Sequence, residues 1–109
     1  MVSNKLNISA GDRELFDKIQ SGDKDAIIKG LVHPGVIYKV NAAINAVRYD
    51  IKDLSMKIYL DRMKEDDRIV NGYRTSDFAY AALELLGMEH YFNNEPRVKM
   101  LIQSKFDFF

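Results

Sequence analysis

The sequence predicts an all-α protein built from about six helices. Apolar residues recur at helical spacing over residues 33–50 and again over residues 73–87, and both stretches are rich in alanine. The two prolines, Pro34 and Pro96, each stand where a helix could begin. No stretch alternates apolar and polar residues for long enough to indicate a strand. We therefore expect helices joined by short connections, with the helix over residues 33–50 at the centre.

Length and composition favour a single folded domain. The chain has 109 residues, of which 47% are hydrophobic and 29% charged, as in ordinary globular proteins. We expect one helical domain over residues 1–109, with residues 1–10 flexible. The 16 basic and 16 acidic residues give a formal net charge of zero, so overall charge should attract neither nucleic acid nor an anionic membrane.

The chain contains no cysteine, which excludes disulfides, thiolate metal sites and cysteine nucleophiles. Residues 1–10 lack the apolar core of a signal peptide, and no apolar run reaches the length of a transmembrane helix. We therefore expect a cytoplasmic protein without membrane partners. Nothing in the sequence points to a cofactor.

The first two helices are expected over residues 12–20 and 23–31. Asp12 and Asp23 have side chains suited to the N-cap position, and a Ser-Gly pair separates the two segments. The third helix, opened by Pro34, carries the most regular apolar pattern in the chain. The residues expected to face inward from these three helices are Leu15, Phe16, Ile19, Ala26, Ile27, Leu31, Val36, Val40, Ala43, Ile44 and Val47.

Asp50 is the expected N-cap of a fourth helix that runs to about residue 64. The residues that this helix should bury are Ile51, Leu54, Ile58 and Met63. The charged run over residues 64–68 is expected to form a solvated helix end and loop. Because charge precedes Asn71-Gly72, we interpret this pair as a turn between helices and not as a β-hairpin.

The fifth helix should begin near Thr75 and stop at Gly87, a typical residue just beyond a helix end. The sixth should run over residues 95–106. The residues expected to face inward are Phe78, Ala79, Ala82, Leu83, Leu85 and Leu86 from the fifth helix, and Val98, Leu101 and Ile102 from the sixth.

A shift of the chain by 39 residues superposes similar apolar residues. It brings Ala42-Ala43 onto Ala81-Ala82, Ile44 onto Leu83, and Val47 onto Leu86. A period near 40 residues with two helices in each unit is typical of helical repeat proteins.

The stretch over residues 33–47 resembles the turn and second helix of a HEAT repeat. In that family a proline near the turn precedes a basic residue and then a helix with paired alanines, and here these roles fall to Pro34, Lys39, Ala42-Ala43 and Val47. The resemblance covers about residues 23–87 and implies antiparallel helical hairpins stacked as a short array. The sequence departs from the pattern at three positions, which are His33 in place of an acid, Tyr73 in place of the second proline, and Phe78 in place of the second basic residue. A helical bundle without repeats is the alternative.

In a HEAT-like stack the second helix of each unit lines the concave side, so the resemblance implies a binding ridge there. The residues expected to form it are Tyr38, Asn41, Asn45, Arg48, Asp77, Tyr80 and Glu84. Tyrosine and arginine are frequent in binding hot spots because they combine large contact area with directional hydrogen bonds. The alternative is a plain solvated helix face.

Three phenylalanines, Phe106, Phe108 and Phe109, stand close together at the end of the sequence. Leaving them in water is costly, since burial of one aromatic side chain is worth about 1.5–3 kcal/mol. We expect them to fold back and cover the last helix, and a docking or dimerisation tail is the alternative.

The function we expect is protein–protein interaction without catalysis. A narrower version is binding and inhibition of a partner, as small antitoxin or immunity proteins do. The partner is expected to be another protein, with a homodimer as the alternative. A nucleic-acid binder acting through Lys39, Arg48 and Arg74 is the second candidate.

A small enzyme acting through His33 or the acids at 65–67 is the third candidate function. Neither His33 nor His90 has a carboxylate or a second histidine at metal-ligand spacing. We expect His33 to precede or cap a helix, and His90 to join an aromatic cluster with Tyr91 and Phe92.

Overall fold

The computed structural model of the protein describes residues 10–107 and 109. This part of the chain contains six α-helices and one short β-hairpin, so the all-α prediction is confirmed. In chain order the elements are α1 (Ala10–Gln20), α2 (Lys24–Leu31), α3 (Val36–Arg48), α4 (Leu54–Met63), β1 (Ile69–Val70), β2 (Tyr73–Arg74), α5 (Thr75–Leu85) and α6 (Pro96–Ser104).

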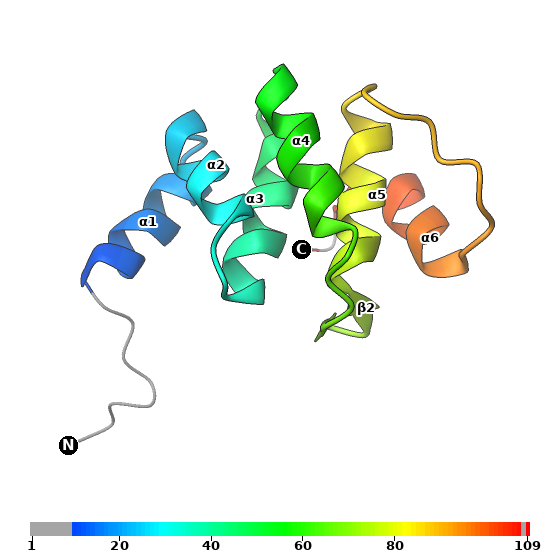
Figure 1. Ribbon diagram of the computed structural model, residues 1–109, viewed down its shortest axis with the longest axis horizontal. Coiled ribbons are helices and arrows are strands. Elements are labelled where there is room, and N and C mark those ends of the chain that lie inside the picture. The colour runs from blue at the N-terminus through cyan, green and yellow to red at the C-terminus, as the bar shows by residue number, and fades with distance from the viewer. Residues whose placement is uncertain (1–9, 108) are drawn as a thin grey trace.

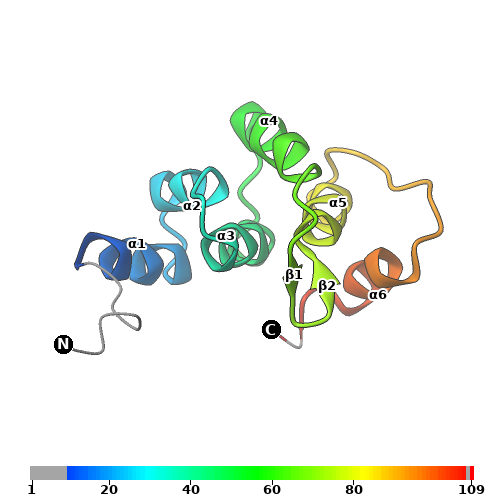
Figure 2. The same ribbon diagram turned by 60° about the horizontal axis from the view of Figure 1, so that its bottom comes forward.

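The helices are arranged in two layers along an elongated molecule of 48 × 27 × 24 Å. Figure 2 shows α2 and α4 on one side and α1, α3 and α5 on the other, with α6 beyond α5. Helix α2 packs against α3 and α4, and α5 packs against α3, α4 and α6 (Figure 1). Helix α3 therefore lies at the centre, in contact with helices from both layers.

Small residues allow the helices around α3 to approach closely. The alanines of α3 and α5 at positions 42, 43, 46, 81 and 82 are all fully buried. At Gly30 in α2, an added Cβ would lie 2.7 Å from Ile19 Cδ1 and 2.9 Å from Ala42 Cβ. No side chain fits at Gly30 without movement, because α1, α2 and α3 meet there.

The start and the buried face of α4 differ from the sequence prediction. The N-cap is Asp53, whose side chain accepts a hydrogen bond from Met56 N, whereas Asp50 lies outside the helix with a φ of 54°. The residues that α4 buries are Met56, Leu60 and Met63. Leu54 is 76% exposed and Ile58 47% exposed, so the prediction that they face the core was wrong. Both apolar sets have helical spacing, and periodicity alone could not choose between them.

The interpretation of Asn71-Gly72 as a simple turn between helices was also wrong. Ile69 pairs with Arg74, and Val70 with Tyr73, in an antiparallel hairpin. Asn71 and Gly72 have φ values of 53° and 84°, the left-handed conformation that a two-residue hairpin turn requires. Val70 is buried, which supplies the apolar contact that holds so short a hairpin in place.

The loop before this hairpin is more ordered than a solvated charged run. The Asp66 side chain is only 10% exposed and accepts hydrogen bonds from Arg68 and from Lys39 of α3. The Arg68 guanidinium, above all, holds the pKa of Asp66 well below its usual range. Arg68 also donates to the main-chain oxygen of Pro34, so the loop is fixed to the start of α3.

Other helix ends follow the sequence more closely. Asp23 and Glu95 are the N-caps of α2 and α6. Helix α5 begins at Thr75 and the chain turns at Gly87, which has a φ of 71°. Asp12 lies inside the first turn of α1 instead of at its cap. Five of the six residues expected in the core from α5 are buried, including Leu86 just beyond its end, and Leu85 is partly exposed.

Candidate functional site

The seven residues of the expected ridge do not form one exposed surface. Asn45 is 2% exposed and Asp77 is fully buried, so the prediction was wrong for these two. Asn45 donates to Gln20 Oε1 at 2.7 Å and to the main-chain oxygen of Asn41 at 2.9 Å. Asp77 Oδ2 accepts from the main-chain nitrogen of Arg74 at 2.8 Å. Both side chains therefore have structural partners.

The other ridge residues point in different directions. Tyr38 is half-buried, with its ring 4.1 Å from that of His33. Arg48 donates to the main-chain oxygen of Phe109. Tyr80 and Glu84 of α5 lie on another side, against the segment that follows this helix. Whether any of these side chains binds a partner stays a prediction.

Phe106 and Phe109 fold back onto the core. Phe106 is fully buried, and its ring centroid lies 6.0 Å from that of Phe78. The ring of Phe109 lies 5.2 Å from Phe78 and 6.0 Å from Tyr73. The two rings fold back as expected, but these ring contacts are with α5 and the hairpin and not with the last helix. Phe108 lies outside the described residues.

The three cations considered for nucleic-acid binding all have partners within the chain. Lys39 Nζ lies 3.2 Å from Asp66 Oδ2, and Arg74 Nη2 lies 3.2 Å from Asp77 Oδ1. The third, Arg48, holds the main chain of Phe109. Contact with a phosphate would have to compete with these existing interactions.

His33 has a structural position, as expected for a residue that precedes a helix. Its Nδ1 accepts a hydrogen bond of 2.9 Å from Gly35 N, the N-cap residue of α3. Its Nε2 lies 3.3 Å from Asp12 Oδ1. Among the residues that the structure describes, no group of three or more potential metal ligands is placed to hold an ion. Within the same residues no helix is long and apolar enough to cross a membrane.

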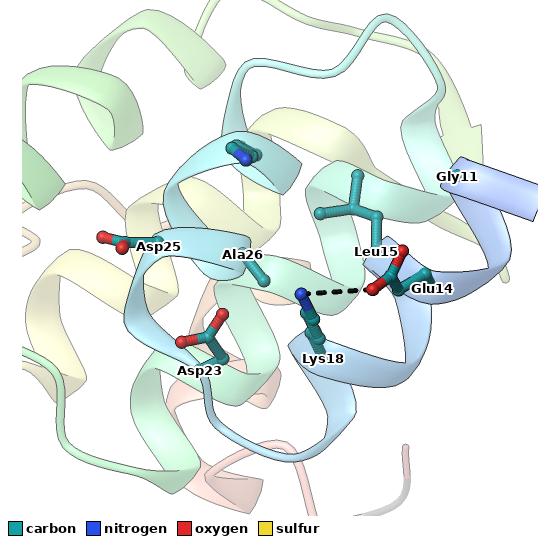
Figure 3. A pocket seen from close by; sticks show the side chains of 8 residues that line it. Gly11, Glu14, Leu15, Lys18, Asp23, Asp25 and Ala26 are labelled. Carbon is teal, nitrogen blue, oxygen red and sulfur yellow. Dashed lines mark ion pairs between the residues drawn. The ribbon is translucent and has the colours of Figure 1, made fainter.

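A hollow of about 350 Å³ lies between α1 and α2. Figure 3 shows Glu14 and Lys18 of α1 joined across one side of it, at 3.3 Å. Asp23 and Asp25 come from the start of α2, and Lys29 follows from its last turn. Five of the eight residues that line this hollow are charged, so it offers little apolar surface for a partner to bury.

A second hollow, of about 430 Å³, lies at the other end of the molecule and is here called the α5–α6 hollow. It is bounded by the end of α5, by the connection over residues 86–95 and by α6. The residues that line it are Glu84, His90, Tyr91, Phe92, Asn93, Asn94, Lys99, Ile102 and Gln103. It combines aromatic, amide and charged side chains, which is typical of binding sites.

The expected aromatic cluster lies at the edge of this hollow. The rings of His90 and Phe92 meet edge to face, with centroids 4.6 Å apart. Phe92 is nevertheless 83% exposed. Glu84 Oε1 accepts from Tyr91 N at 3.0 Å and lies 2.8 Å from His90 Nδ1. The last turn of α5 therefore fixes the main chain that presents Phe92.

Ion pairs also fasten this connection to α4. Glu89 lies 2.6 Å from Lys64 Nζ and 3.4 Å from Lys57 Nζ. Burial opposes the charge of Lys64, but hydrogen bonds with Glu89 and Asp61 prevail and raise the pKa of Lys64. Lys64 also lies over the ring of Tyr80, at 5.1 Å from its centroid. The connection is long, yet it is anchored at several points.

Sequence reasoning found only part of this site. It singled out Glu84 and the His90–Phe92 cluster, but not Lys99 or the amides at positions 93 and 94. The missed clue is the length of the connection, since residues 86–95 are more than the usual four to six between helices. Long connections often carry functional residues.

Comparisons of the chain with protein-family models, with curated proteins and with solved structures found no match. No activity or partner therefore comes to this chain from a relative.

Proposed function

We propose that the protein is a small, non-catalytic interaction domain that binds a protein partner at the α5–α6 hollow. The observation that carries this proposal is the exposure of Phe92, at 83%, on a connection that Glu84 fastens to α5 and Glu89 fastens to α4. Burial of a phenylalanine side chain is worth about 1.5–3 kcal/mol, so a partner that covers Phe92 gains that contribution. In a narrower version, the bound partner is inhibited, as small antitoxin or immunity proteins do.

The surroundings of Phe92 fit a binding hot spot. Such sites place an aromatic anchor among groups that are already ordered, because ordering them on binding would weaken affinity. Tyr91 is held by Glu84, and Glu89 by Lys64. Amides and Lys99 surround the aromatic residue, in keeping with the polar rim of many interfaces.

We also propose that α2–α5 form a short HEAT-like stack, with a non-repeat bundle as the alternative. Support comes from the packing, in which each hairpin, α2 with α3 and α4 with α5, contacts the other through both of its helices. Such stacks are used to display extended surfaces to other macromolecules. We further propose that the protein acts in the cytoplasm.

Nucleic-acid binding has less support as an alternative. The three cations considered for it are engaged by Asp66, by Asp77 and by the main chain of Phe109. A phosphate-binding surface would also make affinity fall steeply with salt, which is a simple way to test it.

Capture of partners from the native host tests the proposed function. The tagged protein is compared with Phe92→Ala and with Leu54→Ala, a matched control that removes an exposed apolar side chain from α4. We expect a stoichiometric companion with the parent and with Leu54→Ala, reduced at least about tenfold with Phe92→Ala, a typical hot-spot loss. Light scattering should show a monomer before the companion is added. Equal capture by Phe92→Ala, or a stable homodimer with no companion, would overturn the proposal.

A further inference from the structure

The charged groups around the α5–α6 hollow are unequally satisfied. Glu84 already receives the main-chain hydrogen bond of Tyr91 and lies 2.8 Å from His90 Nδ1. Lys99, on the first turns of α6, is exposed. Its side chain makes no hydrogen bond or ion pair within the part of the chain that the structure describes. Among the charged residues that line this hollow, Lys99 is therefore the one still available to a ligand.

The remaining lining has two further chemical characters. Phe92 and Ile102 supply apolar surface, and the amides of Asn93, Asn94 and Gln103 supply both donors and acceptors. Such amides match the alternating N–H and C=O groups of a peptide main chain. A volume of about 430 Å³ is at the lower end of the range for ligand sites, so it suits one or two side chains of a larger partner.

We propose that the α5–α6 hollow binds a peptide segment of the partner in which a carboxylate side chain stands next to an apolar one. The carboxylate pairs with Lys99, the apolar side chain packs against Phe92 and Ile102, and the amides bind the main chain. This inference rests on the proposed function and names the chemistry of its partner. A polyphosphate chain fits less well, because its several negative charges would meet a single available cation among the described residues of this hollow.

Two short synthetic peptides test this inference on the full chain. Both are blocked at their ends, and they differ only in a Glu-Leu or a Lys-Leu pair between glycines. Each is titrated into the isotopically labelled protein while the amide resonances are followed by nuclear magnetic resonance. We expect the Glu-Leu peptide to shift the resonances of residues 84, 90–94 and 99–103. Equal responses to the two peptides, or no response in these residues, would overturn the proposal.

Charge reversal at Lys99 sharpens the test. Lys99→Glu should weaken binding of the Glu-Leu peptide about tenfold, because the attraction between Lys99 and the peptide carboxylate becomes a repulsion between two carboxylates. The same variant should bind the Lys-Leu peptide more tightly, because the peptide lysine then faces an opposite charge. Folding should be unaffected, because an acid near the start of a helix interacts well with its dipole. The matched control is Arg13→Glu, an exposed cation at the fourth residue of α1, as Lys99 is of α6. Arg13→Glu should change neither affinity.

The two proposals can fail separately. If Phe92→Ala abolishes capture of a native partner while neither peptide binds, the proposed interaction site is supported and its preference for an acidic–apolar peptide is contradicted. If the Glu-Leu peptide binds but Phe92→Ala captures the native partner as well as the parent does, the hollow has the proposed ligand preference but is not the binding site of that partner. A short oligothymidylate is titrated in the same way. If it shifts the same resonances at lower concentration than the Glu-Leu peptide does, the ligand of the hollow is a nucleic acid and the peptide proposal is overturned.

Discussion

Arg48, the last residue of α3, donates from its guanidinium to the main-chain oxygen of Phe109, 61 residues further along the chain. Next to this hydrogen bond, the ring of Phe109 packs against the rings of Phe78 and Tyr73. Figure 1 shows this end of the chain beside α3 and α5. The segment after α6 is thus joined both to its neighbour α5 and to the central helix.

Replacing Arg48 by alanine should loosen this segment without unfolding the domain. Loss of one hydrogen bond at the surface is worth about 1 kcal/mol or less. The amide of Phe109, which donates to the main-chain oxygen of Phe106 at 3.2 Å, should exchange with solvent faster. Hydrogen exchange checks this, with Arg13→Ala as the control. Unchanged exchange at Phe109 would mean that the Arg48 hydrogen bond does not hold the segment.

Phe106 and Phe92 form a matched pair of phenylalanines with opposite environments, one fully buried and the other exposed. Phe106→Ala should cost about 3–5 kcal/mol because it leaves a cavity against Phe78. Phe92→Ala should change stability by less than about 0.5 kcal/mol, since it removes no core contact. Urea denaturation of both variants gives the comparison. A similar midpoint for the two variants would contradict the core position of Phe106.

Asp77 should be a stability residue and not a contact residue. Its buried carboxylate accepts from Arg74 N and lies 3.2 Å from Arg74 Nη2, at the start of α5. Asp77→Asn keeps the shape but removes the charge, and should cost about 1.5–3 kcal/mol. Asp67→Asn, at an exposed position, is the control. Thermal denaturation measures the stability of both variants. If Asp77→Asn loses partner capture while its stability is unchanged, Asp77 is a contact residue after all.

The Asp53 carboxylate predicts an acid-sensitive contribution to stability. Its hydrogen bonds with Lys24 and Ser55 lower the pKa of Asp53 from 3.8 to about 2. The ionised form is therefore favoured in the folded state, so its contribution is present above about pH 4 and is lost as the pH falls toward 2. Asp53→Asn retains a good N-cap but loses the charge. In denaturation at pH 6, 4, 3 and 2, the parent should exceed Asp53→Asn at pH 6, and the difference should shrink over that window. A constant difference would exclude the charge as its cause.

How far the sequence predicts the structure depends on how many apolar faces a helix carries. In α5 the apolar residues lie where the core needs them, and Thr75 and Gly87 mark its ends. Helix α3 is enclosed by α1, α2 and α5, so even Asn45 on its expected outer face is buried. A pattern of polar and apolar residues does not show that a polar side chain will find a buried partner such as Gln20.

The candidate site was predictable only in part for a different reason. Glu84 and the cluster of His90 and Phe92 stand out by residue type. Lys99 looks in the sequence like any other lysine, and only the fold places it in the lining of the same hollow as Phe92. Its significance comes from the lack of a partner within the described chain, which is a property of the folded molecule.

The two apolar sets of α4 have a consequence for the energy landscape. Met56 and Leu60 face the core, while Leu54 and Ile58 would give a similar helical stripe if the helix were rotated about its axis. Apolar burial alone thus discriminates weakly between two rotational settings, a case of local frustration. The cap from Asp53 to Met56 N lies within α4 and turns with it, whereas the ion pair of Asp53 with Lys24 joins α4 to α2 and so depends on the rotational setting. In α4, the hydrophobic pattern leaves the choice of core face to contacts with neighbouring helices.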